Sequence, residues 1–357
     1  MAGKHKLLGV TVITILSGCY ASHDTNPGET TVSYKSENAA GDTTVRQAGR
    51  ASPDSLGAAG RAALGARPAE QTPADTSDVT FQFDVDVPAG GELLRCVYAQ
   101  MPSDRGVIAV PKVESHYTPG SHHLLAYRSN LTAIPEGKGS PWDCSDGAWQ
   151  LNQRGAYYEA QQPNEERALP PGIAHKFAPG EIMILQAHYV NARDEELSAH
   201  VELTLHPMDP AQVEQEAGTI FFTNVNITVP PHSKATAGMR CTLPQDISLA
   251  LLWSHMHKRG VHFVATTDDP PAAAALGTLY EAADWNEPKQ REYPTDPAVI
   301  LHAGSHITFA CDYQNDSELR YVFGNSAETN EMCILHGMYW PRMPVASEQC
   351  LFGATFK

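Results

Sequence analysis

Residues 80–88 read Thr-Phe-Gln-Phe-Asp-Val-Asp-Val-Pro and decide the fold class. Apolar side chains at 81, 83, 85 and 87 alternate with polar side chains at 82, 84 and 86. Successive side chains of a β-strand point to opposite faces, so this alternation predicts a strand with one buried face. Further runs of strand character, separated by Pro, Gly and Asn turns, follow at 93–101, 107–113, 122–127, 182–190, 201–205, 220–229, 247–253, 261–266, 306–313 and 332–340.

The composition also favours β structure. The 357 residues include 27 Gly and 26 Pro, a density that long helices do not tolerate. Since no window of a dozen residues has a convincing apolar period of 3.6 residues, we expect an all-β protein of two jelly-roll-like antiparallel β-sandwich domains. Pro207, Pro210 and a polar stretch interrupt the strands near 208–215, which places the N-terminal domain at 79–212 and the C-terminal domain at 213–357.

The charge balance excludes one class of partner. The sequence has 25 Lys and Arg against 41 Asp and Glu, for a formal net charge of −16. This charge opposes binding to phosphate backbones and to anionic lipid. We therefore expect no nucleic-acid partner.

The first residues predict export. Lys4 and Lys6 precede a short apolar run at 7–16, which ends in Ser17-Gly18-Cys19. A basic start, a short apolar centre and small residues before a break describe a signal peptide, here 1–18. The Ser-Gly-Cys end resembles the bacterial lipoprotein box, so Cys19 is the predicted lipidation site; the alternative is an ordinary signal peptide.

We expect the mature protein to be anchored to a bacterial membrane, in the outer membrane, through this N-terminal lipid alone. Residues 19–78 are rich in Ala, Gly, Ser, Thr, Pro and Asp, with almost no large apolar side chains. Such a segment cannot offset its ordering entropy by burial, so it is the predicted disordered tether.

The cysteines fit an oxidising compartment. Without Cys19, six of the seven remain: Cys96, Cys144, Cys241, Cys311, Cys333 and Cys350. An even number in an exported protein is typical of a disulfide framework. The sequence has no Cys-x-x-Cys pair, which disfavours a thiolate zinc site.

Two histidine motifs lie in predicted strands of the N-terminal half. His122 and His123 follow the Pro119-Gly120 break, and both imidazoles could reach one metal only if the strand begins or bulges there. In Leu-Gln-Ala-His-Tyr at 185–189, Gln186 and His188 share the face opposite the apolar side chains. Structural roles are the alternative for both motifs: a surface or packing role for the His-His pair, and a satisfied buried histidine for His188.

The C-terminal half carries His255-Met256-His257 after Trp253. The i, i+2 spacing places both imidazoles on one face of a strand, close enough to bind one ion. Hydrolytic zinc sites with this pair usually add a nearby Asp, whereas Lys258 and Arg259 follow here, so we disfavour a zinc amidohydrolase-like enzyme.

Met332, in Glu331-Met332-Cys333, is on its own most simply a core residue. Its thioether is also a soft ligand that selects copper, cuprous copper above all, whereas imidazole suits both oxidation states.

The chain resembles the copper type II, ascorbate-dependent monooxygenases, the family of peptidylglycine alpha-hydroxylating monooxygenase and dopamine beta-monooxygenase, and looks like a bacterial lipoprotein member of it. The resemblance covers about 80–350 and rests on four motifs in the same order: His122-His123, the segment 185–189, His255-x-His257 and the segment 331–333. The family pattern implies the disulfides Cys96–Cys144, Cys241–Cys350 and Cys311–Cys333, and the last would hold the strand that presents Met332.

The resemblance also implies two copper ions per chain, in sites that face each other across a solvent-filled cleft. His122, His123 and His188 would bind the electron-reservoir copper, with Gln186 as a hydrogen-bond partner in the cleft. His255, His257 and Met332 would bind the catalytic copper, where O2 is activated and a substrate C–H bond is hydroxylated. Ascorbate or another reductant would supply two electrons.

Two departures bear on the substrate, which could be a small molecule or peptide-like. Where the peptide-processing branch has an Arg and a Tyr that hold a substrate carboxylate, this sequence has Trp253 and His336. These substrate-binding candidates favour an aromatic or otherwise neutral substrate, although Trp253 could be a core residue. A copper-binding or copper-trafficking lipoprotein without catalysis is the alternative function; two chemically different sites favour the enzyme, because storage alone does not need them.

Overall fold

The computed structural model describes residues 74–283, 285–351 and 353–356, which lie in one compact unit. The predicted signal segment, Cys19 and nearly all of the predicted tether lie outside the described residues. The described part is almost entirely β structure, as predicted from the alternation and the turns. None of its helices is both long and apolar enough to cross a membrane.

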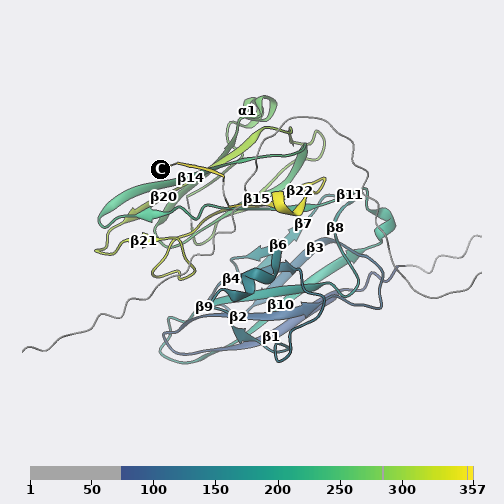
Figure 1. The fold of residues 1–357 in the computed structure, drawn as a ribbon, viewed down its shortest axis with the longest axis horizontal. Helices are drawn as coiled ribbons and strands as arrows, with labels where there is room; N and C mark the ends of the chain where they lie inside the picture. Colours follow the sequence, from purple (N-terminus) through teal and green to yellow (C-terminus); the bar gives the residue numbers. More distant parts are fainter. Residues whose placement is uncertain (1–73, 284, 352, 357) are drawn as a thin grey trace, which may run out of the picture. The chain divides into compact units, whose positions relative to one another are not determined.

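The first part of the chain forms two sheets, here called the N-terminal sandwich (Figure 1). One sheet has the order β1-β10-β3-β8-β11, with β7 on β3, and the other has the order β5-β2-β9-β4-β6. The strands are β1 (Val79–Val87), β2 (Glu92–Gln100), β3 (Ile108–Tyr117), β4 (Ser121–Ser129), β5 (Trp142–Asp143), β6 (Gln153–Ala160), β7 (Asn164–Ala168), β8 (Ile173–Phe177), β9 (Ile182–Val190), β10 (Leu197–Met208) and β11 (Gln215–Glu216).

The rest of the chain forms the C-terminal sandwich. One sheet has the order β18-β15-β22-β12-β23, with β19 on β15; the other has the order β17-β16-β20-β14-β24, and β13 pairs with β21. The strands are β12 (Gly218–Thr223), β13 (Thr228–Val229), β14 (Ser233–Thr242), β15 (Ile247–Met256), β16 (Gly260–Thr267), β17 (Tyr280–Ala282), β18 (Arg291–Glu292), β19 (Ile300–Leu301), β20 (His306–Asn315), β21 (Tyr321–Val322), β22 (Cys333–Trp340), β23 (Gln349–Cys350) and β24 (Ala354–Phe356).

Helices in the described residues are short. They are the 3-10 helices η1 (Ala148–Asn152) and η2 (Pro210–Gln212) and the α-helices α1 (Pro270–Leu276) and α2 (Val345–Glu348). Asp269 caps α1 by accepting a hydrogen bond from the backbone N–H of Ala272, and a proline occupies its first turn.

Each sandwich has its own apolar core. Phe83, Val85 and Val87 of β1 pack with Met183 and Leu185 of β9 in the N-terminal sandwich. Leu249 and Leu335 pack with Phe263 and Phe309 in the C-terminal sandwich. Full burial of such a side chain stabilises the fold by about 1.5–3 kcal/mol.

Strand β9 is buried on both faces, for two different reasons. Met183, Leu185 and Tyr189 lie in the core between the two sheets of the N-terminal sandwich. The opposite face, which carries Gln186 and His188, is also buried. It lines a cavity together with residues of the C-terminal sandwich. The polar face that the sequence predicted therefore lies where the two sandwiches meet.

One predicted strand is wrong in extent. The run 220–229 was expected to be a single strand, but β12 ends at Thr223 and β13 begins at Thr228. Asn224 interrupts the run: its side chain donates to the carbonyl of Gly238 and accepts from the N–H of Asn226. These bonds replace a strand ladder with a turn.

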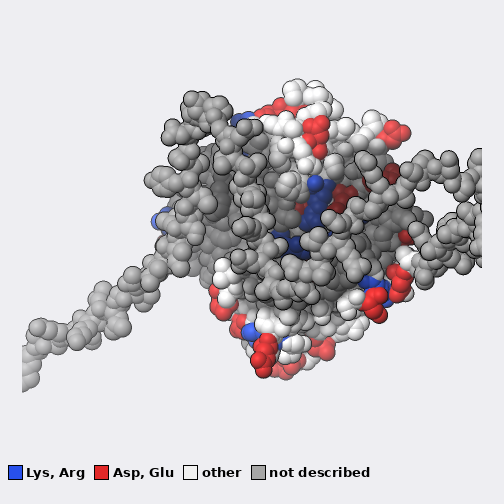
Figure 2. All heavy atoms as spheres, turned by 45° about the vertical axis from the view of Figure 1, so that its right-hand side comes forward, with Lys and Arg blue, Asp and Glu red and all other residues white. Residues whose placement is uncertain are grey.

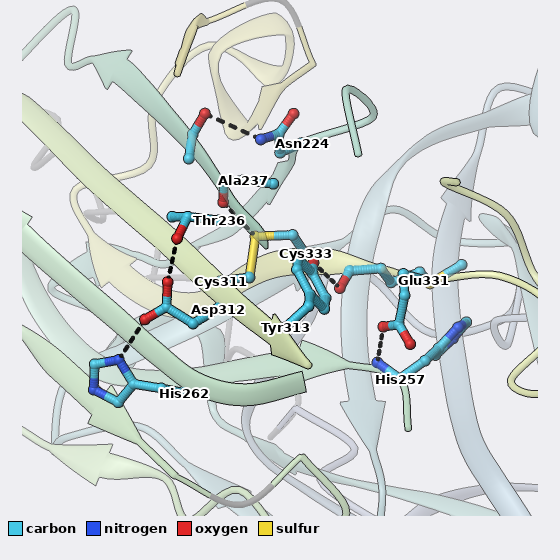
Figure 3. Close-up of a disulfide and its surroundings, with 12 residues drawn as sticks. Asn224, Thr236, Ala237, His257, His262, Cys311, Asp312, Tyr313, Glu331 and Cys333 are labelled. Carbon is cyan, nitrogen blue, oxygen red and sulfur yellow. Dashed lines mark hydrogen bonds and ion pairs between the residues drawn. A yellow bond between two sulfur atoms is a disulfide. The ribbon is translucent and has the colours of Figure 1, made fainter. Parts of the chain in front are cut away.

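The structure contains the three disulfides that the family resemblance implied. Cys96–Cys144 joins β2 to the segment after β5, and Cys241–Cys350 joins β14 to β23. Cys311–Cys333 joins β20 to the start of β22, directly after Met332 (Figure 3). Acidic side chains are visible in the upper and lower parts of the face seen in Figure 2, in keeping with the negative charge of the sequence.

Candidate metal centre and adjoining cavity

His122 and His123 lie at the start of β4, where the sequence predicted a break or a bulge. Gly120 has a φ of 114°, in the left-handed region that favours glycine. The pairing of β4 with β9 then shifts its register between Ser121 and His123. The irregular start lets both imidazoles lie on one side, with ring centroids 5.1 Å apart.

The other histidines arrive from β9 and β15. His188 is the Cα partner of His123 across the β4–β9 ladder, and their ring centroids are 5.0 Å apart. His255 lies near the end of β15, and His257 follows directly after that end. Their ring centroids are 5.3 Å apart.

The five imidazoles form one cluster rather than two groups facing each other across solvent. The ring centroid of His122 lies 5.1 Å from that of His188, 5.1 Å from that of His255 and 5.0 Å from that of His257. Candidate ligand nitrogens of His122, His123 and His255 all lie within 4.8 Å of one another. The resemblance implied two sites that face each other across a solvent-filled cleft. In the structure the start of β4 lies against the end of β15 instead, so the two predicted ligand sets adjoin.

The proton positions of three histidines follow from their outer partners. Nε2 of His188 lies 2.9 Å from Oε1 of Glu92. Nδ1 of His257 lies 3.1 Å from the carbonyl oxygen of Asn330, and Nδ1 of His255 lies 2.9 Å from Oε1 of Gln161. These oxygens can only accept, so each outer nitrogen carries the proton and the other nitrogen of each ring keeps its lone pair.

Four inner nitrogens lack protein partners, whereas Nδ1 of His188 lies 3.4 Å from Nε2 of His123. Nε2 of His122, Nδ1 of His123, Nε2 of His255 and Nε2 of His257 are buried without a hydrogen bond. Burial and the neighbouring imidazoles hold the pKa of His122, His123 and His257 well below the usual value. Buried polar atoms are normally satisfied, so neutral imidazoles with free lone pairs in one buried cluster fit a metal ion that prefers nitrogen ligands.

Met332 lies beside this cluster, directly before β22. Its side chain is partly buried and lines one cavity with His123, His188 and His255. The backbone carbonyl of Met332 accepts a hydrogen bond of 2.9 Å from the hydroxyl of Tyr313 (Figure 3). Met332 therefore lines the same cavity as three of the imidazoles and belongs to neither apolar core.

Glu331, directly before Met332, anchors this segment to the backbone that follows β15. Its buried carboxylate accepts a hydrogen bond of 3.2 Å from the backbone N–H of His257 (Figure 3). It accepts another, of 2.9 Å, from the backbone N–H of Arg259. Burial raises the pKa of Glu331 to about 7, against these hydrogen bonds and the Arg259 guanidinium. The segments that carry Met332 and His257 are thus held together.

The adjoining cavity has a volume of about 210 Å³ and is lined by both sandwiches. Its apolar wall consists of Leu94, Leu125, Tyr127, Trp149, Phe221, Val225, Phe323, Met332, Ile334 and Leu351. Its polar lining consists of Gln150, Gln153, Gln186, Thr223, Asn325 and Gln349, with Glu159 and the histidines. No Lys or Arg of the described chain lines this cavity, and Glu159 is its one carboxylate.

Of the three remaining predicted site residues, Gln186 and His336 line the cavity, and Trp253 does not. Gln186 lines the cavity, but its side chain makes no hydrogen bond with any imidazole in the described residues. His336 also lines the cavity and stacks on Trp253, with ring planes 9° apart. Trp253 is 1% exposed and packs in the C-terminal core behind His336, so its indole does not reach the cavity.

Sequence reasoning missed the carboxylates and the amide that hold the imidazoles. Glu92 lies on β2, and Glu159 lies on β6, with Gln161 directly after that strand. Strand β6 itself was not predicted. A signal for it existed: Ala-Tyr-Tyr-Glu-Ala at 156–160 places a carboxylate within an otherwise apolar strand.

The fold and the site together define a class: an all-β protein with a buried, histidine-rich centre and a thioether at its edge, a ligand set suited to copper. The comparisons agree with this class. Residues 215–353 match the family "Copper type II ascorbate-dependent monooxygenase, C-terminal domain". The chain is also 22% identical over 286 residues to a tyramine beta-hydroxylase from Caenorhabditis briggsae, covering 70% of this chain. Both matches support the copper type II monooxygenase family and an oxygenase enzyme.

The chain spans 46% of the length of that relative. Among solved structures, the major capsid protein P2 of bacteriophage PM2 is 7% identical with a TM-score of 0.32, covering 74% of this chain and 97% of that one. The Macrobrachium rosenbergii nodavirus structure is 9% identical with a TM-score of 0.17, covering 80% and 96%. Neither TM-score supports an argument about this fold.

Proposed function

We propose that the whole chain is a copper-dependent monooxygenase that hydroxylates a C–H bond of a small or peptide-like substrate with O2 and an external reductant such as ascorbate. The observation that carries the proposal is the cluster of four inner imidazole nitrogens without partners, with Met332 on the wall of a cavity that His123 and His255 also line. The family match of residues 215–353 supports copper as the metal.

The family resemblance divides the ligands of this cluster between two adjoining copper ions of different character. His122, His123 and His188 offer nitrogen alone and would hold the electron-reservoir copper. His255 and His257, with the thioether of Met332, would hold the catalytic copper. When bound, copper supplies one-electron redox chemistry and activation of O2. In the overall reaction one oxygen atom enters the C–H bond as a hydroxyl group, and the other leaves as water with two electrons and two protons.

The chain's own residues prepare this chemistry. Glu92, Gln161 and the carbonyl of Asn330 fix which nitrogen of each ring carries a proton, so the lone pairs point inward without reorganisation. The apolar cavity wall binds the substrate and displaces water beside Met332. His336 and Glu159 add polar atoms to the lining of the same cavity.

The cavity favours a substrate without a carboxylate. A carboxylate needs a cation or several N–H donors, and no Lys or Arg of the described chain lines the cavity. Tyr127, Trp149 and Phe221 offer aromatic surface instead. The name of the Caenorhabditis briggsae relative makes tyramine a reasonable first compound to test.

The test is copper analysis of the purified full chain together with reductant-dependent O2 uptake, against aromatic amines, neutral aromatics and peptides ending in glycine. We expect about two copper ions per chain and O2 uptake that matches hydroxylated product. Met332→Ile should abolish product while the nitrogen-only set keeps its copper. Copper binding without any substrate-dependent O2 uptake would favour the copper-trafficking alternative.

We also propose export and lipid anchoring at Cys19, which rests on the sequence of residues 1–19. Cells fed radiolabelled palmitate should label the wild-type chain. Labelling that persists in Cys19→Ala would contradict this proposal.

A further inference from the structure

Glu159 is a buried carboxylate whose ion-pair partners in the described chain are histidines rather than Lys or Arg. It is 1% exposed, on β6 of the N-terminal sandwich. Its ion-pair partners in the described chain are His255, at 3.3 Å, and His336, at 3.0 Å; no Lys or Arg pairs with it. Both histidines belong to the C-terminal sandwich, so this carboxylate reaches across from one sandwich to the other.

The two carboxylate oxygens of Glu159 contact different side chains. Oε2 accepts a hydrogen bond of 2.6 Å from the indole N–H of Trp253 and lies 3.0 Å from Nε2 of His336. Oε1 lies 3.3 Å from Nδ1 of His255. An indole nitrogen can only donate, so the carboxylate acts as an acceptor on this side.

Gln161 completes the contact with His255. Its amide nitrogen donates to the carbonyl of Ser254 at 3.0 Å, which turns its Oε1 toward Nδ1 of His255 at 2.9 Å. Two acceptors from the N-terminal sandwich therefore meet one ring nitrogen of the C-terminal sandwich. Nδ1 must carry the proton, and Nε2 is left with its lone pair.

A carboxylate buried in this way is costly unless a positive charge compensates it. Glu181, in the same sandwich, shows the usual solution: its carboxylate pairs with Arg128 at 2.9 Å and with Arg154 at 2.6 Å. Glu159 pairs with no Lys or Arg of the described residues. A cation bound at Nε2 of His255 would lie across the imidazole from Oε1 and supply the missing charge.

We propose that Glu159 is a positioning residue that fixes the orientation of His255 from the other sandwich and favours the cupric over the cuprous state of the copper bound there. The inference rests on the proposed copper function. It adds a residue outside the predicted ligand set, and it makes the C-terminal copper site depend on the N-terminal sandwich.

The first test needs no copper. Nitrogen-15 NMR of imidazole-labelled apoprotein reports which ring nitrogen is protonated, and His255→Gln assigns the signal of His255. We expect the Nδ1–H form. The Nε2–H form would contradict the inference, whatever the protein does with copper.

The second test measures the ratio of cuprous to cupric affinity by competition with selective chelators. Glu159→Gln keeps the shape and removes the charge, so this ratio should rise by about tenfold, which is 59 mV for a one-electron couple. Glu159→Asp keeps the negative charge but moves it one methylene away from His255. Its ratio of cuprous to cupric affinity should therefore lie nearer the wild-type value than that of Glu159→Gln. Glu181→Gln, which also removes a buried carboxylate, should lower stability without changing the ratio.

The outcomes separate the two proposals. A folded Glu159→Gln chain with an unchanged ratio would overturn this inference and leave the proposed function intact. A wild-type chain that binds no copper would overturn the proposed function, and the tautomer of His255 would then decide the positioning role alone. If Glu159→Gln fails to fold, the wild-type tautomer and the Glu159→Asp ratio decide.

Discussion

The disulfide Cys311–Cys333 links stability to the metal site, because Met332 directly precedes one of its cysteines (Figure 3). The bridge closes a loop with a sequence separation of 22 residues. In the chain-entropy description, closing such a loop stabilises a protein by about 3.4 kcal/mol at 25 °C. Replacing both cysteines by Ala should lower the free energy of unfolding by about this amount, measured by urea denaturation without reductant.

The same replacement should weaken cuprous copper binding by about tenfold, because the strand start that presents Met332 loses its covalent anchor. The matched control is Cys96–Cys144, whose separation of 48 residues corresponds to about 4 kcal/mol. Its removal should cost more stability and leave cuprous affinity near the wild-type value. Equal cuprous affinity in both double variants would refute the link between this bridge and Met332.

Three further predictions follow from the contacts of the imidazoles. Glu92→Gln should cost about 1–2 kcal/mol, a value kept low because Glu92 is partly exposed, and it should weaken copper binding at His188; urea denaturation and copper titration measure both. The hydrogen bond from His188 holds the pKa of Glu92 at about 2, and the histidine and Trp253 contacts of Glu159 hold its pKa at about 2 against burial. Both depressed pKa values give stability that is complete above about pH 4.5 and is lost as pH falls toward 2, which unfolding at pH 7, 4 and 3 should reveal; constant stability across this window would contradict the assignment. Copper at a hundred times its dissociation constant should stabilise the fold by about 2.7 kcal/mol, seen as a higher Tm that a chelator reverses, whereas an unchanged Tm would mean that copper does not bind the folded state.

Much of the fold could be predicted because period-two alternation is a local property. The alternation at 80–88 predicted β1, and the apolar run at 182–190 predicted the bounds of β9. Strand β6 was missed because its run of buried side chains gives no alternation and includes Glu159. Local pattern also misjudged 220–229, where side-chain hydrogen bonds of Asn224 end the strand.

The site could be predicted only in part from the sequence. Motif order indicated five histidines and Met332 as candidate ligands. The structure brings the five imidazoles into one cluster, and His123, His188, His255 and Met332 line the adjoining cavity. How closely the rings approach depends on the meeting of two sandwiches, which no local pattern encodes. The partners of the imidazoles were hidden for the same reason: Gln161 is 94 positions from His255, and Glu92 is 96 from His188.

X-ray absorption of the cuprous full chain tests the central claim most directly, because it reports which atoms surround the metal. We predict imidazole nitrogen scattering together with one sulfur ligand for every two copper ions, and the loss of the sulfur component in Met332→Ile. A wild-type spectrum without sulfur, or one that Met332→Ile leaves unchanged, would contradict the account.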